Sequence, residues 1–149
     1  MLARREPIMR GDFRHFEPVR VRWGDMDSMG HVNNAVYFTY CESARMSYFE
    51  AVDLPGHAAA PSHGPALAAA DLNFRQQVRY PAELEVGARV THLGGKSFTF
   101  EYVLFRRGSE EVVADGSGVI AWVDYEQGKA IPLPDSLRQA IRDYEGGRL

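Results

Sequence analysis

The spacing of apolar residues changes once along the chain, from about four to two, and this change constrains the fold more than any other feature. Apolar residues recur every four positions from Val36 to Val52, which predicts one amphipathic helix over about 35–51. Asn33 or Asn34 can cap its start, and a Leu-Pro-Gly stop follows at 54–56. The expected buried face comprises Val36, Tyr40, Ala44, Tyr48 and Val52, widened by Tyr37, Cys41 and Phe49, and it leaves Thr39, Glu42, Arg45 and Glu50 mostly for the other side.

Alternating apolar and polar residues predict strands on both sides of this helix. A short strand is expected over 19–23, before a loop rich in Gly, Asp and Asn. The segment 56–69 has no clear period and is expected to be a loop, or a short helix around 66–70. Short turns join the later strands, which predicts a consecutive antiparallel meander. These strands are expected over 71–80, 84–90, 98–104 and 111–124, followed by a short helix over 136–144.

This order of elements predicts an α+β fold in which one helix packs against one antiparallel sheet. We expect a single domain over 1–149 with a core over about 19–125, preceded by a frayed N-terminal tail. The last strand is apolar in both registers, so the outer face of the sheet should also be covered. A second copy of the chain is the expected cover, although exposed valines on a monomer are an alternative.

Composition excludes several classes of protein. A formal net charge of −3 gives no broad basic field, which argues against a nucleic-acid partner. No apolar run approaches the roughly 20 residues of a membrane span, and the N-terminus lacks the apolar middle region of a secretory signal. Cys41 is the only cysteine, which favours a reducing, cytoplasmic setting. The histidines show no paired ligand spacing, so neither a metal nor a cofactor is expected.

The loop over 24–34 concentrates the side chains that could carry chemistry. It contains Asp25, Asp27, His31, Asn33 and Asn34, directly before the predicted helix. The first amides of a helix are unpaired and carry partial positive charge, so a carboxylate here lies beside a site that can bind an oxyanion. The same residues are also common turn formers and helix caps.

A thioester suits this arrangement, because its carbonyl is electrophilic and its thiolate leaves without much acid catalysis. One carboxylate and two amide donors could therefore be sufficient for hydrolysis. The chain also lacks the G-x-S-x-G motif of the serine hydrolases, so a Ser-His-Asp mechanism is not indicated.

The stretch VRWGDMDSMGHVNNAVYF over 21–38 resembles the signature of the hydroxybenzoyl-CoA thioesterase type of hotdog protein. The similarity continues through FRQQVRYPA at 74–82 and GGKSFTF at 94–100, and covers roughly 20–124. The resemblance implies the hotdog fold, a long central helix wrapped by a curved antiparallel sheet of about five strands. It also implies homodimers or homotetramers with active sites at the dimer interface, and acyl-CoA, or acyl-carrier protein, as substrate.

The resemblance implies a role for particular residues. Asp27, the second aspartate of the D-x-D pair, matches the catalytic carboxylate, which acts as nucleophile or as general base. The backbone N–H of Asn34 or Ala35 matches the group that polarises the thioester carbonyl, and Asp25 would organise the turn. Further matches are His31, Asn33 and Tyr37 around the pocket, and Lys96 and Ser97 near coenzyme A.

One departure from the family pattern concerns the acyl group. Ser28 stands where the aromatic-CoA enzymes have proline, and the run H-V-N-N at 31–34 is closer to members acting on fatty acyl chains. Aromatic specificity is therefore not assumed. A hotdog hydratase or dehydratase centred on His31, and a non-catalytic acyl-CoA binding protein, are the alternative functions.

Overall fold

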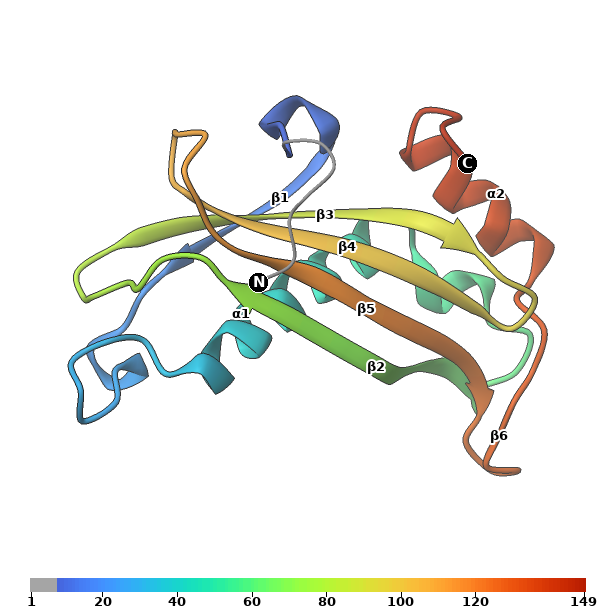
Figure 1. Cartoon of the computed structure of the whole chain (residues 1–149). Coiled ribbons are helices and arrows are strands. Elements are labelled where there is room, and N and C mark those ends of the chain that lie inside the picture. The colour runs from blue at the N-terminus through green and yellow to red at the C-terminus, as the bar shows by residue number, and fades with distance from the viewer. Residues whose placement is uncertain (1–7) are drawn as a thin grey trace.

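The computed structural model describes residues 8–149. One long helix, α1, lies against one face of a curved antiparallel sheet, and a second helix, α2, is the last element of the chain (Figure 1). This is the expected α+β hotdog architecture. The elements are η1 (Arg10–Asp12), β1 (His15–Arg20), η2 (Trp23–Asp25), α1 (Asn34–Ala51), η3 (Leu54–His57), β2 (His63–Phe74), β3 (Glu83–Leu93), β4 (Ser97–Arg106), β5 (Val112–Asp124), β6 (Lys129–Ala130) and α2 (Asp135–Tyr144).

The strands lie in the order β1-β3-β4-β5-β2, with β6 added beside β5. All pairs are antiparallel, and β3, β4 and β5 form the predicted meander. The prediction is wrong for β2, which pairs with β5 at the far edge instead of with β3. The ladder ends where the backbone N–H groups of Arg75 and Gln76 both donate to the Val113 carbonyl, at 2.8 and 3.1 Å. The chain then crosses without regular structure to β3.

The boundaries of two strands also differ from the prediction. β2 begins at His63, so the expected loop or short helix around 66–70 is wrong, and the irregular segment 75–82 replaces the second half of the strand expected over 71–80. Small residues give this strand no visible period, and its pairing with β5 decides its structure. β1 covers His15–Arg20 instead of 19–23, because the chain turns into η2 at Trp23.

The core lies between α1 and the sheet. Tyr48 and Phe49 of the helix contact Phe100 of β4 edge-on or tilted, with ring centroids 4.9 and 6.1 Å away. Trp122 is fully buried on β5. One residue departs from the predicted helical pattern, since Arg45 is only 8% exposed although it was expected on the polar side. Its position beside β4 explains the burial, because its guanidinium donates to the Tyr102 hydroxyl at 3.2 Å.

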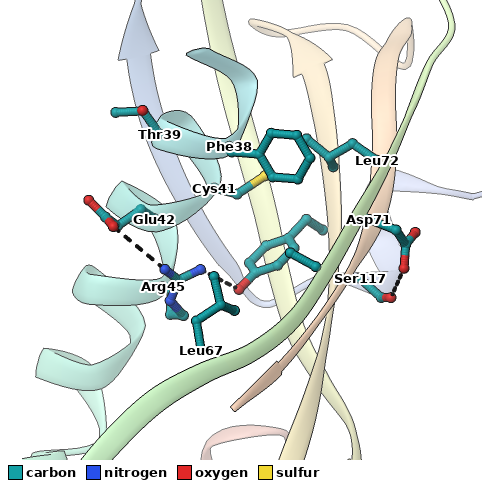
Figure 2. A pocket seen from close by; sticks show the side chains of 11 residues that line it. Phe38, Thr39, Cys41, Glu42, Arg45, Leu67, Asp71, Leu72 and Ser117 are labelled. Carbon is teal, nitrogen blue, oxygen red and sulfur yellow. Dashed lines mark hydrogen bonds and ion pairs between the residues drawn. The ribbon is translucent and has the colours of Figure 1, made fainter. Parts of the chain in front are cut away.

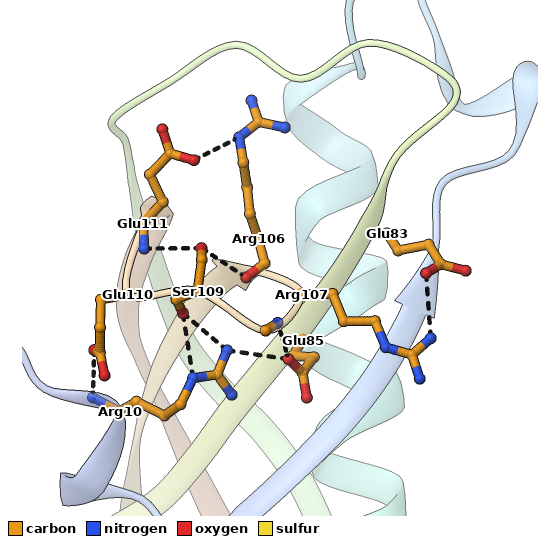
Figure 3. Close-up of polar contacts among 9 residues, drawn as sticks. Arg10, Glu83, Glu85, Arg106, Arg107, Ser109, Glu110 and Glu111 are labelled. Atoms are coloured by element: carbon orange, nitrogen blue, oxygen red, sulfur yellow. Dashed lines mark hydrogen bonds and ion pairs between the residues drawn. The ribbon is translucent and has the colours of Figure 1, made fainter.

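The N-terminal segment covers part of the other face of the sheet, so the expected tail is wrong for residues 8–18, while residues 1–7 lie outside the described chain. Phe13 packs with Val103 and Phe105 in a separate apolar cluster. The guanidinium of Arg10 lies 4.8 Å from the centre of the Phe105 ring. It also pairs with Glu85 at 3.0 Å and donates to the Ser109 carbonyl, which joins the segment to the β4–β5 turn (Figure 3). The chain therefore covers this end of its own sheet.

A buried polar network joins β1, α1 and α2. The His15 ring lies 2.7 Å from both the Tyr144 and the Ser47 hydroxyl oxygens. Ser47 donates its own hydrogen to the Ala44 carbonyl, so it accepts from Nε2 of His15, and Nδ1 then accepts from Tyr144. Both ring nitrogens are thus satisfied in the neutral tautomer.

The stability of this network is expected to depend on pH. Burial lowers the pKa of His15, although Glu17, Ala44 and Glu145 oppose the shift. Because the folded pKa lies below that of the unfolded chain, the stabilisation is complete above about pH 6.5 and declines as the pH falls below that value, by at most about 1.4 kcal/mol per pH unit. Urea unfolding between pH 8 and pH 5 measures this slope. His15→Gln should flatten it, and an unchanged slope in that variant would exclude His15 as its source.

Candidate active site

Asp25 anchors the loop before α1. Its carboxylate is 2% exposed and accepts hydrogen bonds from the Arg22 backbone N–H at 2.9 Å and the Tyr40 hydroxyl at 2.7 Å. Its backbone carbonyl accepts from the N–H of Asn33 at 3.0 Å. Burial alone would raise the pKa of Asp25, but these hydrogen bonds and the Arg22 guanidinium outweigh burial and hold the pKa below its usual range. The geometry is that of a turn organiser, as expected.

Asp27 lies exposed in the same loop. Its Oδ1 accepts from the Met29 N–H at 2.9 Å and, more weakly, from the His31 N–H at 3.5 Å. The backbone holds the turn closed, since the N–H of Asp27 donates to the His31 carbonyl at 2.8 Å. Among residues 8–149, nothing donates to the second carboxylate oxygen. The side chain is therefore oriented through one oxygen, and the other is available.

The two candidate amides at the start of α1, those of Asn34 and Ala35, differ in their hydrogen bonding. The Asn33 side chain caps the helix by accepting from the N–H of Ala35 at 2.9 Å. The N–H of Val36 donates to the Asn33 carbonyl at 2.9 Å. The N–H of Asn34 has no acceptor within the described part of the chain. Of the expected pair, Asn34 is the amide that remains free at the positive end of the helix.

A cavity of about 440 Å³ brings together four of the predicted site residues, Asp27, His31, Asn34 and Tyr37. Asn33 and Ala35 do not line this cavity; Asn33 caps the helix instead. The opposite wall comes from the end of β2 and the segment after it. The other lining residues, which were not expected from the sequence, are Met29, Val32, Phe74, Arg75, Gln76 and Gln77.

Hydrogen bonds and a ring contact hold this second wall of the cavity. Arg75 forms a two-pronged interaction with the buried Asp115 carboxylate on β5, at 2.9 and 3.2 Å, and Asn73 adds a weaker hydrogen bond to it at 3.3 Å. The ring of Phe74 meets the ring of Tyr37 edge-on, with centroids 5.3 Å apart. The FRQQ run at 74–77 was visible in the sequence, but only the crossing of the chain after β2 brings it opposite Asp27.

Lys96 and Ser97 do not line this cavity. Lys96 lies in the turn between β3 and β4, and Ser97 begins β4, at the end of the sheet near α2 and away from the 24–33 loop (Figure 1). Ser97 pairs with Ala121 on β5, whereas Phe74 of the cavity pairs with Ala114. Within one chain, the expected coenzyme A residues and Asp27 are therefore at different ends of the sheet.

Among residues 8–149, no group of three or more His, Cys, Asp or Glu side chains could hold a metal ion. No helix in this range is both long and apolar enough to span a membrane.

Known proteins are similar to this chain in fold and in sequence. A thioesterase from Thermus thermophilus, solved with coenzyme A and Zn, is 34% identical with a TM-score of 0.77, covering 91% of this chain and 96% of that one. The long-chain acyl-CoA thioesterase FadM of Escherichia coli is 27% identical over 83% of this chain and 93% of its own length. The chloroplastic acyl-acyl carrier protein thioesterase ATL3 of Arabidopsis thaliana is 29% identical over 83% of this chain, which spans 65% of that relative.

A curved antiparallel sheet around one long helix defines the hotdog fold. The model of the thioesterase-like superfamily matches residues 21–141. The chain belongs to that superfamily.

Proposed function

We propose that the protein is an acyl-CoA thioesterase that hydrolyses its substrate to a free carboxylic acid and coenzyme A, with Asp27 as the catalytic carboxylate. The observation that carries this proposal is the cavity that both Asp27 and Asn34 line, since the N–H of Asn34 has no acceptor among residues 8–149. The activities named for FadM and for the Thermus thioesterase support the reaction class.

In the proposed mechanism, the thioester carbonyl oxygen accepts from the Asn34 N–H. The helix dipole favours negative charge there, so the tetrahedral oxyanion is stabilised more than the ground state. The unpaired oxygen of Asp27 then attacks the carbonyl carbon, or takes a proton from an attacking water. In both pathways the carbon–sulfur bond breaks as the oxyanion collapses, and the coenzyme A thiolate leaves. After direct attack, water hydrolyses the resulting mixed anhydride and releases the Asp27 carboxylate. In the water pathway, the proton that Asp27 accepted passes to the thiolate.

We further propose that two copies share each site. β2 is an edge strand with an unpaired side, and it exposes Leu67 at 50% and Phe74 at 42%. Phe38 of α1 is 39% exposed beside it. A second copy that pairs along this edge would cover these side chains, and it could bring its own Lys96 and Ser97 towards coenzyme A. Light scattering should give a dimer or tetramer, and a monomer at assay concentration would contradict the shared site.

A substrate screen tests the proposed reaction. Purified protein is incubated with acyl-CoA thioesters of varied length, with a benzoyl-CoA, and with acyl groups on acyl-carrier protein, and free thiol is followed with a chromogenic reagent. Thiol release from coenzyme A is the expected result. Release only from the carrier protein would change the thiol partner. With an enoyl-CoA as substrate, loss of enoyl absorbance without thiol release would instead indicate a hydratase centred on His31.

A further inference from the structure

A second cavity, of about 140 Å³, lies between α1 and the sheet (Figure 2). Its walls are mainly apolar side chains, with Phe38 and Cys41 on the helix and Leu67 and Leu72 on β2. Burial raises the pKa of the Cys41 thiol to about 12, so this side chain is a neutral part of the wall. The mechanism proposed above makes no use of this space.

The second cavity lies farther along the same face of the helix than the first. Asn34, Phe38, Cys41 and Arg45 follow at spacings of four, three and four residues, which places them in one row on α1. On β2, Leu72 and Phe74 share one face because side chains two residues apart point the same way. Phe74 lines the first cavity and Leu72 the second. An acyl chain held at Asn34 can therefore extend along this row.

The row ends at a buried cation. Arg45 is 8% exposed, and its guanidinium donates to the Tyr102 hydroxyl at 3.2 Å and lies 3.8 Å from the exposed carboxylate of Glu42 (Figure 2). A guanidinium carries five N–H donors, and the described residues provide no other acceptor for it. An alkyl chain pushed against these donors would remove their access to water without replacing it, which is unfavourable.

We propose that Arg45 sets the length limit of the acyl group, an inference that rests on the proposed thioesterase function. The guanidinium lies beside the carboxylate of Glu42. The helix rises about 1.5 Å per residue, so Glu42 lies about 12 Å beyond Asn34 along its axis. An extended chain advances about 1.2 Å per bond. The space between the oxyanion site and the cation therefore accommodates acyl groups of up to about ten carbon atoms.

A length series tests the limit. Hydrolysis of straight-chain acyl-CoAs from C4 to C16 should show kcat/KM rising by up to about fourfold per methylene to about C10, and no further gain beyond that length. Arg45→Met, of similar length and without donors, should continue the rise towards C14. Arg45→Lys keeps a buried cation and should keep the limit. Binding of S-alkyl-CoA thioethers, which cannot be hydrolysed, should show the same dependence in each protein.

The outcomes separate this inference from the reaction itself. If Arg45→Met is poorly folded because the Tyr102 hydroxyl loses its partner, the double variant R45M/Y102F removes both polar groups. Asp27-dependent hydrolysis with a wild-type optimum at C14 or longer refutes the length limit and leaves the reaction standing. An unchanged profile in both apolar variants refutes the role of Arg45. A wild type that hydrolyses no acyl-CoA and binds no thioether refutes both proposals.

Discussion

Replacing Asp27 with asparagine is expected to lower kcat for acyl-CoA hydrolysis by about 10²- to 10⁴-fold, the usual contribution of a catalytic carboxylate. Asparagine is neither a nucleophile nor a base, so the attack step loses its driving group. Its side-chain oxygen can still accept from the Met29 N–H that now bonds Oδ1 at 2.9 Å. The loop geometry should therefore persist, and steady-state release of free thiol measures the loss.

Two controls make this result specific. Binding of an S-alkyl-CoA thioether to Asp27→Asn should stay within a few-fold of wild type, because the substitution leaves the cavity intact. Glu50→Gln neutralises an exposed carboxylate at the opposite end of α1 and should keep full activity. Turnover of Asp27→Asn close to that of Glu50→Gln would remove Asp27 from the reaction.

Replacing Asp25 with alanine is expected to lower the free energy of unfolding by about 2–4 kcal/mol, because several donors lose their acceptor. These donors are the backbone N–H and the exposed guanidinium of Arg22, and the Tyr40 hydroxyl. Activity should fall as well, since the loop that carries Asp27 loses its anchor, although Asp25 itself does not line the cavity. Urea unfolding and kcat/KM, measured on the same preparation, give the two effects.

The pH dependence and a milder variant define the role of Asp25 further. Its folded pKa is depressed, so its stabilisation is present above the unfolded value of about 4 and is lost as the pH falls through the folded pKa. Tyr40→Phe removes only one of the donors and should lower the free energy of unfolding by about 1 kcal/mol. If Asp25→Ala matched wild type in stability and in kcat/KM, the anchoring role would be excluded.

Local sequence was most informative where local interactions decide the structure. The helix was expected over 35–51 and is observed over Asn34–Ala51, because its cap, its apolar spacing and its stop all lie within the segment. The 24–34 loop was selected for the same reason, since residues adjacent in sequence create it. The resemblance then distinguished Asp27 from Asp25, and the structure buries the carboxylate of Asp25 and exposes that of Asp27.

Such local patterns could not predict which strands pair over long distances in the chain. β2 is rich in alanine and shows no period of its own, so its partner β5 determines where it begins and ends. The resulting crossing brings Arg75, Gln76 and Gln77 opposite Asp27. Arg45 matched the polar side of the helix by spacing, but the position of Tyr102 on β4 buries it.

The amino-acid sequence alone determined the helix, the alternating strands and the acidic loop at the helix start, because hydrophobic spacing, capping and turn chemistry act over a few residues. Only the tertiary structure decided which strand forms the sheet edge and which residues complete the cavity. Those features depend on contacts between segments far apart in the chain, and a local sequence pattern does not encode such contacts.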